Sequence, residues 1–174
     1  MKIKRIARAL IIFAILCCNV GCDQISKTLV RQTLAYNEEI GVIEDFVTLT
    51  RIENTGAFLS LGHALPGPVK ILLLTILPVL VLGGALIFVL RKSDLSDLTI
   101  LGICFVIGGG IGNIYDRIVY GSVTDFLHID FGIFQTGIFN MADVSIMTGM
   151  FIVVVASYLK SHSLYFNSIE NDSE

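Results

Sequence analysis

Two aspartates in this sequence stand out as a pair that could carry out acid–base chemistry. Asp125 lies in the stretch Gly121 to Gly132, where apolar and polar residues alternate, and it falls on the face where the pattern calls for an apolar residue. Asp143 lies near the start of the last long apolar stretch. Two carboxylates held together away from water cannot both ionise cheaply, so such a pair keeps one proton between them. The ionised member can then activate a water while the protonated member donates to a carbonyl, as in two-aspartate peptidases.

Simpler roles exist for several of the polar residues near this pair. Asn140 and Asp143 are three residues apart, which also fits an N-cap followed by an acid in the first turn of a helix. Asp116 and Arg117 also fit a local ion pair or an anchor at a membrane interface, and Lys27 can extend its ammonium group to such an interface. Spacing alone leaves these alternatives open.

Other site chemistries find little support. The sequence has neither an H-E-x-x-H zinc motif nor a G-x-S-x-G nucleophile motif. Its four cysteines form no C-x-x-C pair, and His128 falls on the polar face of its alternating stretch, which favours an exposed side chain. These observations disfavour a zinc protease, a serine hydrolase and a cysteine-based site.

The composition predicts a membrane protein. Of 174 residues, 54% are hydrophobic and only 16% are charged, against about 25% in ordinary soluble domains. The net charge of −3 is too small to imply a nucleic-acid partner. Four stretches have the length and apolar character of a membrane-spanning helix. They cover about residues 6–25, 71–90, 98–115 and 139–159.

Charges next to these spans predict the orientation, because Lys and Arg in short loops stay on the cytoplasmic side. Basic residues precede the first span, fill the short link between the second and third (Arg91 and Lys92), and follow the fourth (Lys160). Both termini should therefore be cytoplasmic, with residues 26–70 and 116–138 outside the cytoplasm. We treat residues 1–160 as one membrane domain and 161–174 as a polar cytoplasmic tail without fixed structure.

The outer segments are more than linkers. Phe46 to Gly62 alternates in polarity and is rich in Val, Thr and Ile, which predicts one or two strands with a turn near Asn54-Thr55-Gly56. The stretch from Gly121 to Gly132 also alternates in polarity and predicts a further strand. The expected fold class is a membrane all-α bundle of four transmembrane helices with a small extracytoplasmic β-strand platform.

This topology brings the polar residues of the spans to one membrane depth, on the outer side. Ionisable residues at that depth are costly and are candidates for function. Asn113 and Arg117 are four residues apart and share a helical face. The cluster contains Asp23, Lys27, Asn54, Asn113, Asp116, Arg117, Asp125, Asn140 and Asp143.

Four motifs in this cluster make the chain resemble the lipoprotein signal peptidase family, also called signal peptidase II. They are "GCDQISK", "NTGAFLSLG", "GGGIGNIYDRIVYGSVTDF" and "FNMAD", in the order and on the spans that the family requires. The resemblance covers the chain from Asp23 to about Gly149. Within the second motif it departs from many family members after N-x-G-A, where they have a small residue and then an aromatic and this chain has Phe58-Leu59 before Ser60.

The resemblance implies roles for the residues at motif positions. Asp125 and Asp143 would form the catalytic dyad. Asp23 and Lys27 would support the site. The motif positions expected to bind the substrate backbone or hold the dyad are Asn54, Gly56, Asn113, Arg117 and Asn140.

The resemblance also implies a reaction and a location. The enzyme would be a hydrolase of the bacterial cytoplasmic (inner) membrane, acting near its outer face without a metal, a cofactor or a covalent intermediate. Its substrates would be prolipoproteins whose cysteine carries a diacylglyceryl group, cleaved just before that cysteine. Membrane lipids are the other expected partners, and we expect a monomer.

Two different interpretations remain open. "VGC", ending at Cys22, resembles a lipoprotein cleavage box, although Asn19 stands where such a box has an apolar residue. Alternatively, the chain is a non-enzymatic transporter or assembly factor whose acids form a polar relay. Transporters often contain paired halves, and no such symmetry is apparent here.

Overall fold

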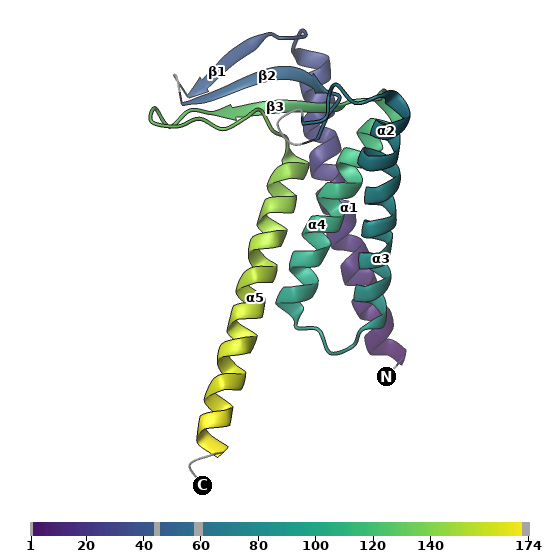
Figure 1. The fold of residues 1–174 in the computed structure, drawn as a ribbon, viewed down its shortest axis with the longest axis vertical. Coiled ribbons are helices and arrows are strands. Elements are labelled where there is room, and N and C mark those ends of the chain that lie inside the picture. Colours follow the sequence, from purple (N-terminus) through teal and green to yellow (C-terminus); the bar gives the residue numbers. More distant parts are fainter. Residues whose placement is uncertain (1, 44–45, 58–60, 172–174) are drawn as a thin grey trace.

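Four long helices stand side by side, and a small sheet lies across one end of them (Figure 1). The computed structural model describes residues 2–43, 46–57 and 61–171. Within those residues, four helical segments are long and apolar enough to cross a membrane. The predicted fold class is therefore confirmed. The Phe58-Leu59-Ser60 departure lies outside the described residues.

The helices extend beyond the predicted spans. Helix α1 is Lys2–Thr33, α4 is Asp97–Tyr120 and α5 is Met141–Asn171. The second span combines α2 (Gly67–Ile71), a π-helix (Leu72–Ile76) and α3 (Leu77–Arg91). The tail that we expected to lack structure continues α5 as far as Asn171, in a stretch without Gly or Pro to break it.

Helix α1 is longer than its hydropathy suggested because its last two turns serve the sheet. Val30 and Leu34 form a small buried cluster with Phe126 of the sheet. The membrane-spanning window ends near Ile25 by composition, but these apolar residues continue at helical spacing. Helix α1 therefore rises past the membrane bundle and supports the sheet.

Helix α4 is the centre of the bundle and packs against α1, α3 and α5. Ser96 caps its start by accepting a hydrogen bond from Thr99 N at 3.2 Å, and Gly121 ends it in the left-handed region with φ of 76°. Its run of glycines permits close helix packing. Gly108 contacts Asn19 of α1, Gly109 contacts Ala142 of α5, and Gly110 contacts Leu82 of α3.

The sheet has three antiparallel strands in the order β1-β2-β3. Strand β1 is Glu39–Ile43, β2 is Val47–Asn54 and β3 is Val123–Ile129. The two predicted strand regions correspond to β2 and β3, whereas β1 was not predicted. Asn54 lies opposite Val123, and Ile52 lies opposite Asp125. This register puts Asn54 and Asp125 at the end of the sheet that joins the bundle.

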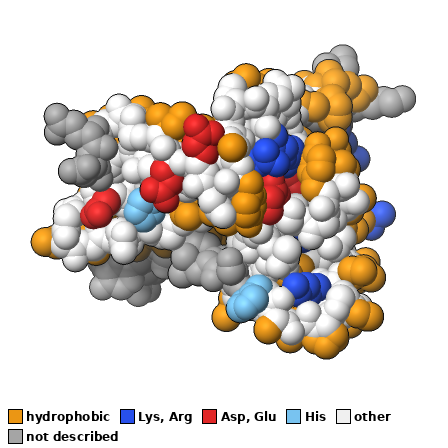
Figure 2. Space-filling view, turned by 90° about the horizontal axis from the view of Figure 1, so that it is seen from above, with side chains coloured by type: hydrophobic (Ala, Val, Ile, Leu, Met, Phe, Trp, Pro, Cys, Tyr) orange, Lys and Arg blue, Asp and Glu red, His pale blue; other side chains and the backbone are white. Residues whose placement is uncertain are grey.

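The outer surface of the bundle is mainly apolar. Viewed from above, hydrophobic side chains edge much of the outline, while charged side chains lie mostly within it (Figure 2). Leu80, Phe151 and Val154 are among the large apolar residues that the helices expose. Such a surface suits contact with lipid chains.

Candidate active site

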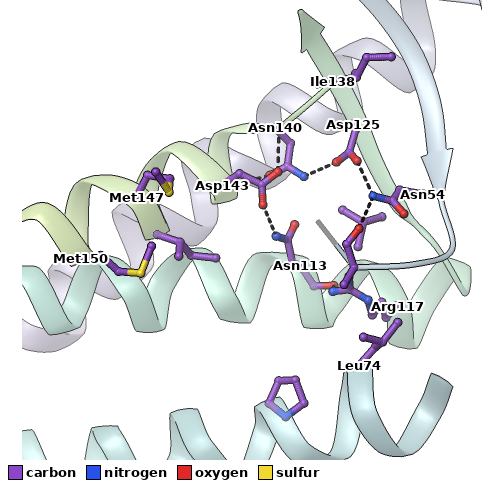
Figure 3. Close-up of a pocket in the computed structure, with 14 residues that line it drawn as sticks. Asn54, Leu74, Asn113, Arg117, Asp125, Ile138, Asn140, Asp143, Met147 and Met150 are labelled. Carbon is purple, nitrogen blue, oxygen red and sulfur yellow. Dashed lines mark hydrogen bonds between the residues drawn. The ribbon is translucent and has the colours of Figure 1, made fainter. Parts of the chain in front are cut away.

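Asp125 is held by two asparagine amides. Only 4% of the residue is exposed. Asn54 Nδ2 donates to Asp125 Oδ2 at 2.9 Å, and Asn140 Nδ2 donates to Asp125 Oδ1 at 2.6 Å (Figure 3). The carboxyl group is therefore anchored from β2 on one side and from the start of α5 on the other.

Asp143 lies in the first turn of α5 and forms a capping box with Asn140. Asp143 N donates to Asn140 Oδ1 at 3.0 Å, and Asn140 N donates to Asp143 Oδ2 at 3.2 Å. The capping interpretation is thus confirmed. It does not exclude a role in a site, because the same Asn140 side chain donates to Asp125. Asn140 therefore connects the two aspartates directly.

Asn113 reaches Asp143 from α4. Its Nδ2 donates to Asp143 Oδ1 at 2.9 Å, while its Oδ1 accepts from Lys27 Nζ at 2.9 Å. Both oxygens of Asp143 consequently have a hydrogen-bond donor, one from α4 and one from the backbone of Asn140. Asp143 thus resembles Asp125 in having a hydrogen-bond donor on each carboxylate oxygen.

Lys27 is completely buried between acids, so the interfacial alternative for its ammonium group is wrong. Its Nζ lies 2.8 Å from Asp23 Oδ2 and 3.1 Å from Asp116 Oδ2, in addition to the hydrogen bond to Asn113. An ammonium group has three N–H donors, and here each has a partner. Burial of a charge is tolerated when it is paired in this way.

Asp116 belongs, with Asp23, Lys27 and Arg31, to one buried ionic cluster. It pairs with Lys27 and, at 2.9 Å, with Arg31 of α1. Thr124 N donates to Asp116 Oδ2 at 3.3 Å, which ties the cluster to β3. The expected local ion pair between Asp116 and Arg117 is therefore wrong, because Asp116 turns toward α1.

Asp23 supports the start of α5. Its Oδ1 accepts a hydrogen bond from Ala142 N at 2.9 Å, and Ala142 is the residue before Asp143. Gly112 of α4 packs directly against the Asp23 carboxylate, where a Cβ atom would collide with it. The absence of a side chain at Gly112 lets α1 and α4 approach closely enough for this contact.

Arg117 holds the turn that follows β2. Arg117 donates to the Gly56 carbonyl at 3.0 Å, and Gly56 N donates to Asn54 Oδ1 at 2.9 Å. Asn54 Nδ2 also donates to the Ala57 carbonyl at 3.0 Å. The Asn54 amide is thus oriented with its nitrogen toward Asp125.

Burial and charge raise the pKa of Asp125 to about 6 from its ordinary value of 3.8. Loss of hydration is the largest cause, and the nearby charge of Asp143 adds to it. The amides of Asn54 and Asn140 act in the opposite direction because they stabilise the ionised form. Asp125 therefore holds a proton at a pH where an exposed aspartate has lost it.

Both aspartates line one cavity of about 400 Å³ at the sheet end of the bundle (Figure 3). Asn54, Asn113, Arg117 and Asn140 line it as well. The remaining predicted residues lie behind this wall, with Gly56 bonded to Arg117 and with Asp23 and Lys27 in the buried ionic cluster. The structure therefore brings all nine predicted site residues together.

The apolar wall of this cavity was not predicted. Leu74 and Pro78 line it from the π-helix and α3, and Ile146, Met147 and Met150 line it from α5. Met147 and Met150 follow Asp143 at spacings of four and seven, which places all three on one face of α5. That spacing could have identified them. Gln24 and Arg31 were not predicted either. Both contact Asp116 from α1, and no local pattern signals these contacts between helices distant in sequence.

Metal-ligating side chains do not gather in the described part of the chain. Among residues 2–43, 46–57 and 61–171, no group of three or more His, Cys, Asp or Glu side chains is arranged to hold a metal ion. The donors at this site are instead asparagine amides and backbone N–H groups.

Comparison with known proteins identifies the family. Residues 14–159 match the family model described as Signal peptidase (SPase) II. The chain belongs to the signal peptidase II family. Members of this family are membrane peptidases that remove signal peptides from lipoproteins.

Individual members of the signal peptidase II family align over most of this chain. The lipoprotein signal peptidase of Streptococcus pneumoniae is 32% identical, over 79% of this chain and 85% of that protein. That of Syntrophus aciditrophicus is 34% identical, over 76% and 83%. That of Geobacillus thermodenitrificans is 28% identical but aligns over 96% and 98%.

Solved structures of bacterial membrane enzymes share this fold. A bacterial membrane enzyme solved by the in meso method at 2.3 Å superimposes with a TM-score of 0.77 at 25% identity, over 86% of this chain and 88% of that one. A second, at 1.9 Å, gives a TM-score of 0.74 at 26% identity, over 83% and 90%.

Proposed function

We propose that this chain is an aspartic endopeptidase that cleaves diacylglyceryl-modified prolipoproteins just before the lipidated cysteine. Family membership supports the cleavage of lipoprotein signal peptides. The observation that carries the aspartic mechanism is the link through Asn140, which bonds both Asp125 and Asp143 beside one cavity. A water held between these carboxyl groups would lie within reach of both.

The two aspartates would divide the chemistry. Asp125, whose pKa is raised to about 6, would carry the proton and donate it to the scissile carbonyl oxygen. Asp143 would be ionised and would take a proton from the attacking water. Asp143 would then give the proton taken from water to the nitrogen of the scissile bond. The C–N bond would break to release the amine of the cysteine, and Asp125 would recover its proton from a hydroxyl of the tetrahedral intermediate.

The surrounding residues would position this pair. Asn54 and Asn140 hold Asp125, and Asn113 holds Asp143. Arg117 holds the turn at Gly56, where backbone groups could bond an extended substrate. Asp23 and Lys27 would act through Ala142 and Asn113 without touching the substrate.

The apolar wall of the cavity would receive the end of the signal peptide. Leu74 and Pro78 on one side, and Ile146 and Met150 on the other, present apolar surface next to the carboxyl groups. A signal peptide is itself apolar before its cleavage point. A prolipoprotein whose signal peptide lies in the membrane could therefore place its scissile bond beside Asp125 and Asp143.

The site would lie near the outer face of the inner membrane, with both chain termini in the cytoplasm. The basic residues Arg5, Arg8, Arg91 and Lys92 gather near the end of the bundle opposite the sheet (Figure 1). That distribution favours a cytoplasmic location for this end. We further propose that residues 1–160 form one monomeric peptidase domain.

The test is a processing assay on a lipidated precursor peptide. Asp125→Asn and Asp143→Asn should each abolish cleavage while the purified proteins keep the helix content of the wild type. Asp130→Asn is the matched control, because Asp130 lies at the end of β3 and bonds only Gly132 N with its side chain among the described residues. Normal cleavage by either dyad variant would overturn the mechanism, and a wild type that cleaves nothing would favour the non-enzymatic alternative.

A further inference from the structure

Three cavities meet at Ile138, in the segment that joins β3 to α5. One is the cavity with both aspartates. A second, of about 410 Å³, lies against the sheet and is lined by polar residues that include Glu39, Thr48 and His128. The third, of about 300 Å³, lies along the start of α5 and is mainly apolar. We call this third cavity the α5 groove; its walls are residues 136–139 and the side chains of Asp143, Val144, Met147 and Thr148.

One wall of the α5 groove is fixed to the sheet. Phe139 N donates to the Leu127 carbonyl at 2.9 Å, and Leu127 N donates to the Phe139 carbonyl at 2.8 Å. Thr136 N donates to the Ile129 carbonyl at 2.9 Å. These bonds hold residues 136–139 against β3, so this wall of the groove is formed by hydrogen-bonded backbone.

The other wall is the first two turns of α5. Val144 and Thr148 are four residues apart and share a face, and Met147 lies beside them. Val144 is 36% exposed and Met147 is 62% exposed, although α5 spans the membrane. The groove is therefore open on a helix surface that faces lipid chains rather than water.

The groove is continuous with the candidate active site. Ile138, Asp143 and Met147 line both the groove and the cavity that holds Asp125. An occupant of the groove would consequently start next to Asp143 and run down α5 toward the bilayer. The polar cavity at Ile138 lacks this apolar lining and does not suit a hydrocarbon chain.

We propose that the α5 groove binds one acyl chain of the diacylglyceryl group on the substrate cysteine. This inference rests on the proposed function, because it concerns the substrate of that site. In the proposed cleavage the lipidated cysteine is the residue directly after the scissile bond, so its lipid must leave the dyad by a short route. The α5 groove supplies that route, while the cavity wall at Leu74 and Pro78 remains available for the signal peptide.

The first test fills the groove and varies the acyl chain. Val144→Trp should raise the KM for a dipalmitoylglyceryl precursor peptide by about tenfold, the size of an ordinary overpacking penalty. The KM for a dibutyrylglyceryl peptide of the same sequence should rise less than about twofold, because a short chain does not reach the filled part. Thr148→Trp, one turn further from Asp143, should show the same discrimination.

The matched control is Val154→Trp, which makes the same change on a lipid-facing part of α5 that lines none of these three cavities. It should leave both KM values near those of the wild type. An equal rise for both peptides with the groove variants, no rise for either, or the same discrimination by Val154→Trp would overturn the proposal.

The second test does not depend on cleavage. A dipalmitoylglyceryl precursor with a photoreactive group at the end of one acyl chain is irradiated with the full-length Asp125→Asn variant in phosphatidylglycerol vesicles. We expect label within residues 136–148. Label confined to residues 72–91 would overturn the acyl-chain site, whether or not the wild type cleaves the peptide.

Discussion

Lys27 Nζ donates a hydrogen bond to Asn113 Oδ1 at 2.9 Å, and this contact decides which end of the Asn113 amide faces Asp143. An amide whose oxygen is occupied by a cation must present its nitrogen to the next partner. The buried ionic cluster and the candidate dyad are therefore coupled through one side chain. The buried charge of Lys27 therefore orients the Asn113 amide that donates to Asp143.

Lys27→Met should destabilise the protein strongly. It leaves the carboxylates of Asp23 and Asp116 without the cation between them, and breaking a buried pair in this way costs about 3–5 kcal/mol. Thermal unfolding in detergent would measure the loss. Lys160→Met, which removes an exposed lysine from α5, is the control and should change stability by less than about 0.5 kcal/mol. A similar melting temperature for both variants would contradict a stabilising role for the cluster.

Asn54→Ala should move the alkaline limb of the pH–activity profile to higher pH. Asn54 donates to Asp125 and so favours its ionised form, which means that its loss raises the pKa of Asp125 above about 6. In the proposed mechanism Asp125 must hold a proton, so activity falls as pH rises through that pKa. The measurement is kcat/KM against pH.

Gln135→Ala is the control for the Asn54 variant. It removes another amide near the sheet whose side chain makes no hydrogen bond within the described residues. Its alkaline limb should coincide with that of the wild type. A limb that moves to lower pH in Asn54→Ala would show that this amide does not stabilise the Asp125 carboxylate.

Asp125→Asn should change how stability depends on pH. An aspartate with its pKa raised from 3.8 to about 6 stabilises the folded state below pH 3.8 and loses that contribution as pH rises through 6. Replacement by Asn removes this dependence. The variant should therefore gain up to about 3 kcal/mol relative to the wild type between pH 4 and pH 7.

The measurement for Asp125→Asn is thermal unfolding of both proteins across that pH range. The asparagine also places an amide nitrogen near the donors Asn54 and Asn140, which adds a cost that does not vary with pH. The informative quantity is therefore how much the stability difference between variant and wild type changes from pH 4 to pH 7. A constant gap between the proteins would show that Asp125 titrates normally.

Gly112→Ala should weaken the contact between α1 and α4. A methyl group at Gly112 would collide with the Asp23 carboxylate, which itself holds Ala142 N. We expect a loss of about 1–3 kcal/mol in stability, measured by thermal unfolding, together with reduced cleavage. Gly84→Ala in α3 has open space around the new methyl group and should be neutral or slightly stabilising. Equal behaviour of the two variants would contradict the packing role of Gly112.

Much of the site could be predicted because its residues break local patterns. Asp125 is recognisable as an acid on the apolar face of a strand, and the structure places it, buried, opposite Ile52. Asn140 and Asp143 are recognisable from capping spacing. The family motifs then connected these separate signals, since one motif contains Asp125 and another contains both Asn140 and Asp143.

The remainder depends on contacts that no local pattern contains. Strand β1 is exposed along its whole length and has Gly41 at its centre, so it lacks the alternation that marks a half-buried strand. The partners of Asp116 come from α1 and β3. Asp116 pairs with Arg31, which is distant in sequence, and not with Arg117, the next residue along the chain, and this choice is visible only in the folded structure. The π-helix at Leu72–Ile76 precedes Pro78, which was visible in the sequence but did not specify the geometry.

The bridge made by Asn140 has a consequence for biogenesis. Asp125 and Asp143 belong to a strand outside the bundle and to the last helix, and Asn140 joins them only once that helix has started in its final place. A chain still emerging from the ribosome, with three helices inserted and the fourth not yet begun, already contains Asp125 but not Asp143. The proposed protease would therefore stay inactive until its last helix is made and takes its place in the membrane.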